Sequence, residues 1–448
     1  MKEVKVNMNF LSYKEDLIRS LIDILSIPSF NSEATDKYPF GINIDKALKK
    51  ALDISSSLGL KPVYENGYYG FADYGNGKDL LGIIGHIDVV PFGDLDKWVL
   101  SPLMPGIMDG KLIGRGTMDD KGPLIICLYA FKSLIDEGFI PSKRIRFIFG
   151  TDEERSWLGI KKYADQEEIP TLGFTPDSAF PLVYAEKGLF QFQLSSKCKN
   201  NIKLSGGSAV NSVPSSARIV MKGENTNLEN SLIELGYEYS IQGNEITVLG
   251  KASHAAIPET GINAINRACR ALYKSNIHTG LVDFIAEQYD ENCVVYNPMK
   301  NIKDAESGYL STNIGIINID EDNESVLIDI RQPVTIPFRE IEEQIIENAD
   351  KYDLNYERKH YLAPLYVDRN SELVSKLHNS FNKVTGLNLP PQSCGGGTYA
   401  RAFENCVAYG PGMPHMEDVG HKPNEYITLK DIELIFNIYK DAIYELSK

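Results

Sequence analysis

The sequence predicts an α/β domain with a mixed, mainly parallel sheet, interrupted by an inserted α+β domain. Three observations support this prediction. Short apolar segments before residue 186, predicted as buried strands, end in acid-rich turns; the alternation of strands and helices stops near Lys187; and it resumes near Pro364. We therefore assign residues 1–186 and 362–448 to the first domain and residues 187–361 to the insertion.

Apolar residues at helical spacing predict the helices, and short apolar or β-branched runs predict the strands. Ser12 and Glu15 predict a capping box before the first helix. The expected helices are 17–25, 42–58, 124–136, 156–163, 262–273, 340–348, 371–385 and a last one from residue 429. The expected strands are 61–65, 70–74, 80–84, 144–150, 172–175, 190–195, 216–222, 245–249, 326–331 and 407–409.

The strand at residues 80–84 leads into a histidine and an aspartate. Its continuous apolar run suits a strand buried on both faces; a buried helix would look similar, but the run is short and Gly85 follows it. His86 and Asp88 are two residues apart, so in an extended chain they point the same way. A neighbouring carboxylate can fix the tautomer of a metal-binding imidazole. For this pair alone, a surface histidine beside a surface aspartate remains an alternative.

Acidic residues recur at three further turns. Asp119 and Asp120 precede a predicted helix in which Pro123 suits the first position, Glu153 and Glu154 follow the strand 144–150, and Asp177 follows the strand 172–175. Carboxylates at this density repel one another unless a cation or a proton lies among them. Each turn alone could be a solvated helix N-terminus, where acids are favourable. The recurrence favours one shared site at the carboxyl ends of the strands.

Composition narrows the class of protein. Of the 448 residues, 43% are hydrophobic and 24% charged, which is ordinary for a globular protein. The formal net charge of −15 argues against nucleic-acid binding and against docking on anionic membranes. No apolar run approaches the roughly 18 residues of a membrane span. The six cysteines form no C-x-x-C pair, and residues 1–10 lack a signal-peptide core, so we expect reduced thiols and a cytoplasmic location.

Imidazole and carboxylate groups without a thiolate suit zinc, manganese or cobalt. Two such ions need one shared carboxylate and about two further ligands each, which makes five residues. A sixth residue is then available as general base. The candidates are His86, Asp119, Glu153, Glu154, Asp177 and His421. This inventory predicts a two-metal hydrolase.

Four motifs in this order, G-H-I-D-V-V-P, G-R-G-T-M-D-D-K-G, T-D-E-E and H-K-P-N-E, carry a family resemblance. The chain resembles the co-catalytic zinc peptidases of the aminoacylase and carboxypeptidase clan, and within it most resembles the PepV-type bacterial dipeptidases. The resemblance covers nearly the whole chain. It implies a zinc-peptidase catalytic domain formed by the first and last segments and an inserted lid domain.

The resemblance also implies the ligand set for two Zn²⁺ ions, with manganese or cobalt as possible substitutes. His86 and Asp177 would hold one ion, Glu154 and His421 the other, and Asp119 would bridge them. His415 lies in the same loop as His421, but His421 is part of H-K-P-N-E, so we prefer it.

Further roles follow from the same resemblance. Glu153 would be the general base acting on a metal-bridging water, and Asp88 would orient His86. A cis peptide is expected between Asp119 and Asp120.

Three residues of the insertion match the family's lid motifs. His254, in G-K-A-S-H-A, would stabilise the developing oxyanion, and Asn211 would touch the substrate. Arg331, in D-I-R-Q-P, would clamp the substrate carboxylate, for which a bidentate guanidinium is well suited. Turn chemistry remains an alternative for Asn211, and a structural ion pair remains one for Arg331. The backbone N–H groups of 395–397 could bind substrate or simply form a tight turn.

The leading prediction is a monomeric metal-dependent dipeptidase that hydrolyses dipeptides with a free amino end. The alternative is an amidohydrolase of the same clan acting on N-acyl amino acids, of the deacylase or desuccinylase type. A non-catalytic metal-binding protein is a third reading, against which an intact Glu153 argues, since a pure binding site needs no such base. The expected partner is a small peptide substrate, with no nucleic acid and no membrane.

Overall fold

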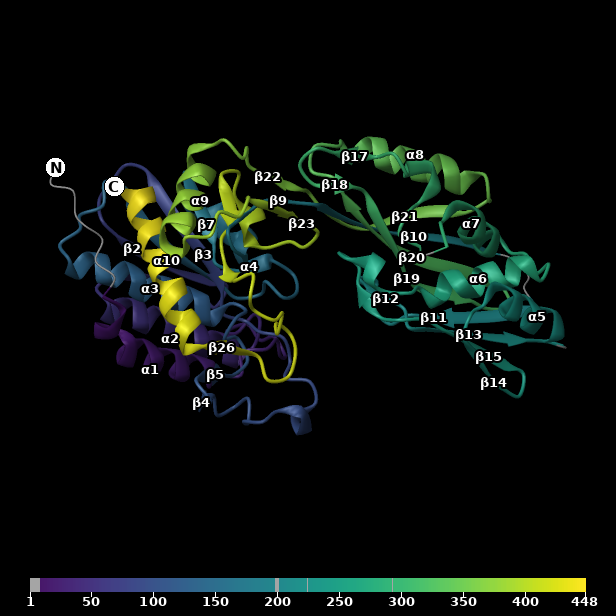
Figure 1. The fold of residues 1–448 in the computed structure, drawn as a ribbon, viewed down its shortest axis with the longest axis horizontal. Helices are drawn as coiled ribbons and strands as arrows, with labels where there is room; N and C mark the ends of the chain where they lie inside the picture. The colour runs from purple at the N-terminus through teal and green to yellow at the C-terminus, as the bar shows by residue number, and fades with distance from the viewer. Residues whose placement is uncertain (1–8, 198–200, 224, 292) are drawn as a thin grey trace. The chain divides into compact units, whose positions relative to one another are not determined.

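A computed structural model describes residues 9–197, 201–223, 225–291 and 293–448 (Figure 1). The chain forms two compact units. Unit 1 contains the chain up to Tyr184 together with Val367–Gln392 and Thr398–Lys448, and unit 2 contains Ala185–Tyr366 and Ser393–Gly397. The sequence-based division had placed residues 393–397 in the first domain, whereas here they pack with unit 2.

Unit 1 is built on a mixed sheet with the strand order β1-β2-β6-β3-β7-β24-β9. Its central strands β6, β3, β7 and β24 are parallel, while β1, β2 and β9 pair antiparallel at either side. The bounds are β1 Lys61–Glu65, β2 Tyr69–Tyr74, β3 Leu80–His86, β6 Arg144–Gly150, β7 Leu172–Thr175, β9 Val183–Glu186 and β24 Cys406–Ala408. Every residue of β3 is buried, as its continuous apolar run predicts. The predicted α/β class is confirmed.

The helices of unit 1 cover this sheet. They are α1 Lys14–Leu25, α2 Ile42–Ser57, α3 Lys121–Asp136, α4 Leu158–Gln166, α9 Glu372–Thr385 and α10 Leu429–Ser447. Helix α3 is almost wholly apolar and packs against β3, α1 and α10, which explains why it is buried nearly all round. Helix α10 packs in turn on α9, so the end of the chain closes the same core (Figure 1).

Two local predictions about helix starts were wrong. Helix α1 has Tyr13 as its N-cap, with no side-chain cap, because the Ser12 hydroxyl donates to Asn9 Oδ1 instead. Pro123 is the third residue of α3, not the first. Its missing N–H still lies in the first turn, where an intrahelical acceptor is lacking in any case.

Unit 2 is an antiparallel sheet with helices, in the strand order β14-β15-β13-β11-β19-β20-β10-β21. Its strands are β10 Gly188–Lys197, β11 Ile202–Gly206, β13 Ser216–Met221, β14 Tyr239–Gln242, β15 Glu245–Leu249, β19 Ser311–Ile319, β20 Asn323–Gln332 and β21 Asn355–Leu362. Its helices are α5 Thr226–Leu235, α6 Ala264–Lys274, α7 Gly280–Gln288 and α8 Phe338–Asp350. Alternate residues of β10 are buried under α7, in the period of two that a one-sided core requires.

Short strands complete both units. They are β4 Gly106–Met108, β5 Lys111–Ile113, β8 Ser178–Ala179, β12 Ser212–Val213, β16 Ser253–His254, β17 Lys303–Asp304, β18 Gly308–Tyr309, β22 Leu365–Tyr366, β23 Gln392–Cys394, β25 Pro411–Gly412 and β26 Tyr426–Thr428. Among the described residues, no helix is both long and apolar enough to cross a membrane.

The parallel centre of unit 1 positions the predicted site. Because β6, β3 and β7 run in the same direction, the turns that follow them leave the sheet at one edge. These turns carry His86 with Asp88, then Glu153 with Glu154, and then Asp177. The neighbouring strand β24 leads into the loop that ends with His421.

Candidate active site

His86 ends β3 and is held in one orientation. Its ring Nδ1 lies 2.9 Å from the backbone carbonyl of Asp88, and its backbone N–H donates to Asp120 Oδ2 at 3.1 Å. A carbonyl oxygen only accepts, so in a neutral ring Nδ1 carries the proton and Nε2 carries the lone pair. Nε2 points at carboxylates, 3.0 Å from Asp119 Oδ1 and 3.6 Å from Asp177 Oδ2.

Asp119 lies between two groups of polar side chains. Its Oδ1 faces His86, while its Oδ2 lies 2.9 Å from Nε2 of His421. The same His421 nitrogen is 3.2 Å from Glu154 Oε1. The result is two triads that share Asp119, one with His86 and Asp177 and one with Glu154 and His421, and within each triad the ligand atoms lie within 4.8 Å of one another. The predicted cis peptide between Asp119 and Asp120 is also present.

The donor atoms of these triads suit divalent cations. Nε2 of His86 and Oε1 of Glu154 are buried, and the polar atoms nearest to them belong to other members of the triads, Asp119 Oδ1 at 3.0 Å and His421 Nε2 at 3.2 Å. Lone pairs that converge in this way are suited to hold a cation between them. Two imidazoles and three carboxylates without a thiolate form a set that zinc, manganese or cobalt accepts.

The pKa shifts in the two triads also favour a bound cation. Burial alone would lower the pKa of His86, but the carboxylates of Asp119 and Asp177 outweigh it and raise that pKa well above its usual value. Burial, followed by the neighbouring charge of Asp119, raises the pKa of Asp177 to about 7. The negative charge concentrated here is what a bound cation would stabilise.

Glu153 lies beside the two triads that the described residues form, but it is a member of neither. Burial raises the pKa of its carboxyl well above the ordinary value, and the charges of Asp177, Glu154 and Asp119 raise it further. A carboxylate with a raised pKa is a stronger base than an exposed one. Such a group is suited to accept a proton during a reaction and to return it.

Asp88 does more than the expected orientation of His86. Its carboxylate oxygen lies 3.4 Å from His86 Nδ1, farther than its own carbonyl. The two carboxylate oxygens instead accept the backbone N–H groups of Glu153 at 3.2 Å and Glu154 at 3.1 Å. Asp88 therefore fixes both the histidine of one triad and the turn that carries Glu153 and Glu154.

Glu425 is a site residue that the sequence reasoning missed. It is fully buried and accepts the backbone N–H groups of Gly116, Met118 and Asp119 at 2.8–3.2 Å. Arg115, also buried, donates to Glu425 Oε2 at 2.8 Å and to the carbonyl of Lys422, next to His421, at 3.2 Å. This ion pair joins the loop of Asp119 to the loop of His421. The available signal was that both residues lie inside the quoted motifs.

Two more supporting residues were not predicted. Asp120 is buried, burial raises the pKa of its carboxyl well above the ordinary value, and its Oδ2 holds the His86 backbone by accepting the N–H at 3.1 Å. Tyr399 is buried with its ring edge-on to His86, at a centroid distance of 6.2 Å. Side chains that only support ligands show no motif of their own in a single sequence.

In unit 2, Asn211 and His254 lie on neighbouring segments. Strand β12 pairs with β16, and the carbonyl of Asn211 accepts the N–H of Ala255 at 2.9 Å. Nδ1 of His254 accepts the N–H of Ala256 at 3.2 Å, so in the neutral ring the proton is on Nε2, which becomes a donor.

Arg331 is buried and already bonded within unit 2. It donates through Nε to Asp329 Oδ1 at 2.7 Å and through Nη2 to Oδ2 at 3.4 Å, and Nη1 donates to the carbonyl of Gly395 at 2.7 Å. Three of its five N–H groups are thus used. His415 is exposed and pairs with Asp431 at 2.9 Å, outside both triads, in agreement with the preference for His421.

Comparison with known proteins decides the family. The model described as "Peptidase family M20/M25/M40" matches residues 82–445. The chain belongs to this peptidase family. A protein of Staphylococcus aureus strain USA300 named "Putative dipeptidase" is 33% identical over 97% of this chain and 97% of its own length. A relative of the same name in Staphylococcus epidermidis is 32% identical over 97% of this chain and 98% of its own.

Solved structures show the same fold as this M20-family chain. Human carnosine dipeptidase 1 has a TM-score of 0.60 at 15% identity, covering 98% of each chain. An M20-family metallo-carboxypeptidase from Sulfolobus solfataricus has a TM-score of 0.60 at 18% identity, covering 96% of this chain and 99% of that one. The predicted clan and enzyme class are confirmed, while the particular likeness to PepV-type dipeptidases stays a prediction.

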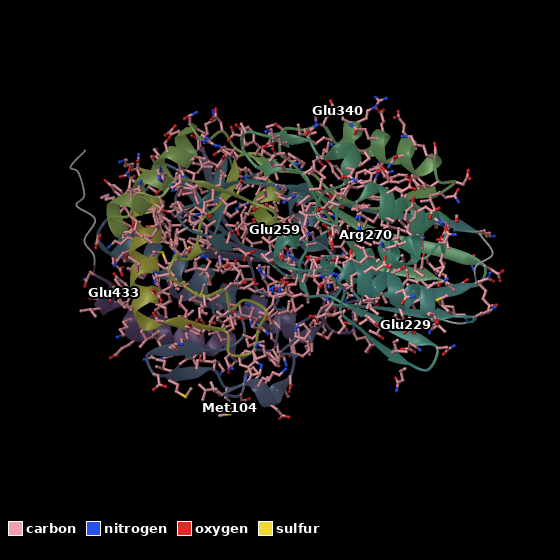
Figure 2. All side chains as sticks on the ribbon, turned by 45° about the vertical axis from the view of Figure 1, so that its right-hand side comes forward. Met104, Glu229, Glu259, Arg270, Glu340 and Glu433 are labelled. Atoms are coloured by element: carbon pink, nitrogen blue, oxygen red, sulfur yellow. The ribbon has the colours of Figure 1, made fainter. Side chains whose placement is uncertain are left out.

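We predict that Glu425→Gln destabilises unit 1. The substitution breaks a buried ion pair and leaves Arg115 uncompensated, which costs about 3–5 kcal/mol. Both tryptophans, Trp98 and Trp157, lie in unit 1, so their fluorescence during urea unfolding reports on this unit. The matched control is Glu433→Gln, an exposed glutamate on α10 (Figure 2). Equal unfolding midpoints for the two variants would contradict the assignment.

Proposed function

We propose that this protein is a divalent-metal-dependent dipeptidase that cleaves the peptide bond of dipeptides with a free amino end. The observation that carries the proposal is the pair of triads sharing Asp119, with Glu153 beside them but outside both. A site that only bound metal would have no need of the additional base. The relatives named as dipeptidases match the chain over nearly its whole length and support the substrate class.

The metal site follows from the donor set. We assign His86 and Asp177 to one ion and Glu154 and His421 to the other, with Asp119 contacting both. Two Zn²⁺ ions are the proposed occupants, and Mn²⁺ or Co²⁺ are possible substitutes. When bound, such ions polarise the scissile carbonyl and lower the pKa of the attacking water.

The chain's own residues move the protons. Glu153 takes a proton from the attacking water as its oxygen bonds to the carbonyl carbon. The same carboxyl then returns the proton to the leaving nitrogen as the C–N bond breaks, which releases a neutral amine and a carboxylic acid, and the acid loses its own proton to water. Asp88 keeps Glu153 in place through its backbone N–H.

Residues of unit 2 are proposed to meet the substrate. The Nε2–H of His254 would stabilise the developing oxyanion, since its tautomer is set by Ala256. Arg331 would bind the substrate carboxylate through its two remaining N–H groups, and Asn211 would contact the substrate. We propose that His254 acts within its own chain and that the enzyme is a monomer; sedimentation of active enzyme as a dimer would refute this.

We predict that Glu153→Gln lowers kcat by about 10²–10⁴-fold. The amide cannot accept a proton, yet it is nearly the same size, and Glu153 is outside both triads, so bound metal should stay at the wild-type level. Turnover and metal content are measured on the same preparations, with Glu433→Gln as the control. A metal-loaded Glu153→Gln enzyme with near-normal kcat would remove Glu153 from the base role.

A substrate panel separates the dipeptidase from the amidohydrolase alternative. We expect a dipeptide to exceed both its C-terminally extended tripeptide and its N-acetyl derivative in kcat/KM by more than about tenfold, or 1.4 kcal/mol. One more residue displaces the carboxylate by about 3.3–3.6 Å from Arg331, and acetylation removes the ammonium charge that acidic groups would pair with. Preference for the acetylated compound would move the assignment to N-acyl amino acids.

A further inference from the structure

A cavity of about 470 Å³ opens beside the shared aspartate in unit 1. Asp119 and Asp177 form part of its wall, so it is continuous with the triads. Its largest apolar side chains are those of Met118, Met413, Met416 and Phe180, and the smaller Ala179, Pro411, Pro414 and Val419 also line it. We name this space the methionine cavity. Its volume falls in the range that proteins use for small ligands.

Two segments that follow neighbouring parallel strands build the cavity. Strand β8, just after Asp177, pairs in parallel with β25, and the N–H of Phe180 donates to the carbonyl of Gly412 at 2.8 Å. The turn beyond β25 is closed by the N–H of Met416 donating to the carbonyl of Met413 at 2.9 Å. The cavity therefore lies between a segment that starts at Asp177 and one that ends at His421.

The cavity has a fixed floor and adaptable walls. The Phe180 ring is buried and packs on Phe381 and Tyr409 at centroid distances of 5.5 Å and 4.9 Å, which leaves it little freedom. Methionine side chains are unbranched and polarisable, so Met416, which is only partly buried and whose Sδ accepts the N–H of Met413 at 3.3 Å, can adjust to apolar groups of different shape. This combination suits a large apolar side chain of variable form.

The charges around the cavity disfavour an acidic side chain. Glu417 and Asp418 line it in addition to Asp119 and Asp177, and within the described chain no lysine, arginine or histidine lines it. Asp119 and Asp177 are assigned to the metal ions, but Glu417 and Asp418 are not, and these two exposed carboxylates would repel an acidic side chain at the mouth of the cavity. A neutral apolar group meets no such penalty.

We propose that the methionine cavity receives one of the two side chains of the dipeptide and selects a large apolar side chain, such as leucine, methionine or phenylalanine, over an acidic one. This inference rests on the proposed dipeptidase function and adds its side-chain preference. Met416 is the residue best suited to a test, because it is only partly buried and can be replaced without opening the core.

The test measures kcat/KM for two series, Ala-X and X-Ala, with X as leucine, methionine, alanine, lysine or aspartate. Wild-type enzyme should prefer leucine or methionine over aspartate by at least tenfold in one series. Met416→Ala should lower that preference about tenfold in the same series, and Met416→Lys should shift it toward aspartate. The control is Met104→Ala, since Met104 is 75% exposed and outside the cavity lining (Figure 2).

The outcomes separate the two proposals. Hydrolysis of dipeptides with an X preference that neither Met416 variant alters would overturn the methionine cavity as a subsite and leave the dipeptidase assignment standing. An equal loss on all substrates in both series would also overturn it. If wild-type enzyme preferred lysine at X in the series that the Met416 variants alter, the carboxylates of the cavity would determine the selection, and the proposed apolar preference would be overturned. Absence of hydrolysis of every dipeptide would overturn both proposals together.

Discussion

The two oxygens of the Asp119 carboxylate face two different imidazoles, and the rest of the site depends on that placement. Oδ1 lies 3.0 Å from His86, and Oδ2 lies 2.9 Å from His421. One histidine ends a central strand, while the other is in a loop more than three hundred residues later in the chain. A single short side chain can serve both only if the backbone on which it sits is held firmly in place.

The surrounding structure supplies that constraint through buried hydrogen bonds. The Glu425 carboxylate accepts three backbone N–H groups from the loop of residues 116–119. Arg115 donates both to this carboxylate and to the carbonyl of Lys422, the residue after His421. Asp88 does the corresponding work on the other side by accepting the N–H groups of Glu153 and Glu154. Acids thus appear in two distinct roles, as the proposed ligands and base in the site and as buried acceptors that hold its loops.

Much of the architecture could be predicted from the sequence because it depends on local patterns. Each pattern is visible within a short stretch of sequence: the apolar run of β3, the acid-rich turns after β6 and β7, and the end of the strand–helix alternation near Lys187. The same patterns predicted one shared site, since parallel strands bring their carboxyl ends to one edge, whereas its division into two ligand sets came from the family resemblance. The pairing of Asp119 with both histidines is consistent with the family resemblance of four separate motifs.

The rest depended on partners distant in sequence. The carboxylate of Asp88 finds backbone N–H groups 65 and 66 residues away, and Glu425 finds its partners more than 300 residues away. The capping box at Ser12 failed because Asn9 offered the hydroxyl a competing acceptor. Residues 393–397 joined unit 2 through contacts such as that of Gly395 with Arg331, which no local pattern reveals.

Metal stoichiometry, measured by equilibrium dialysis of the metal-free protein against Zn²⁺, tests the shared site most directly. We expect two ions for wild type, one for His421→Ala and none bound tightly by Asp119→Ala, because Asp119 serves both triads and His421 serves one. Folding of each variant is checked by the fluorescence of Trp98 and Trp157. Retention of both ions by folded Asp119→Ala, or a single ion in wild type, would contradict the shared site.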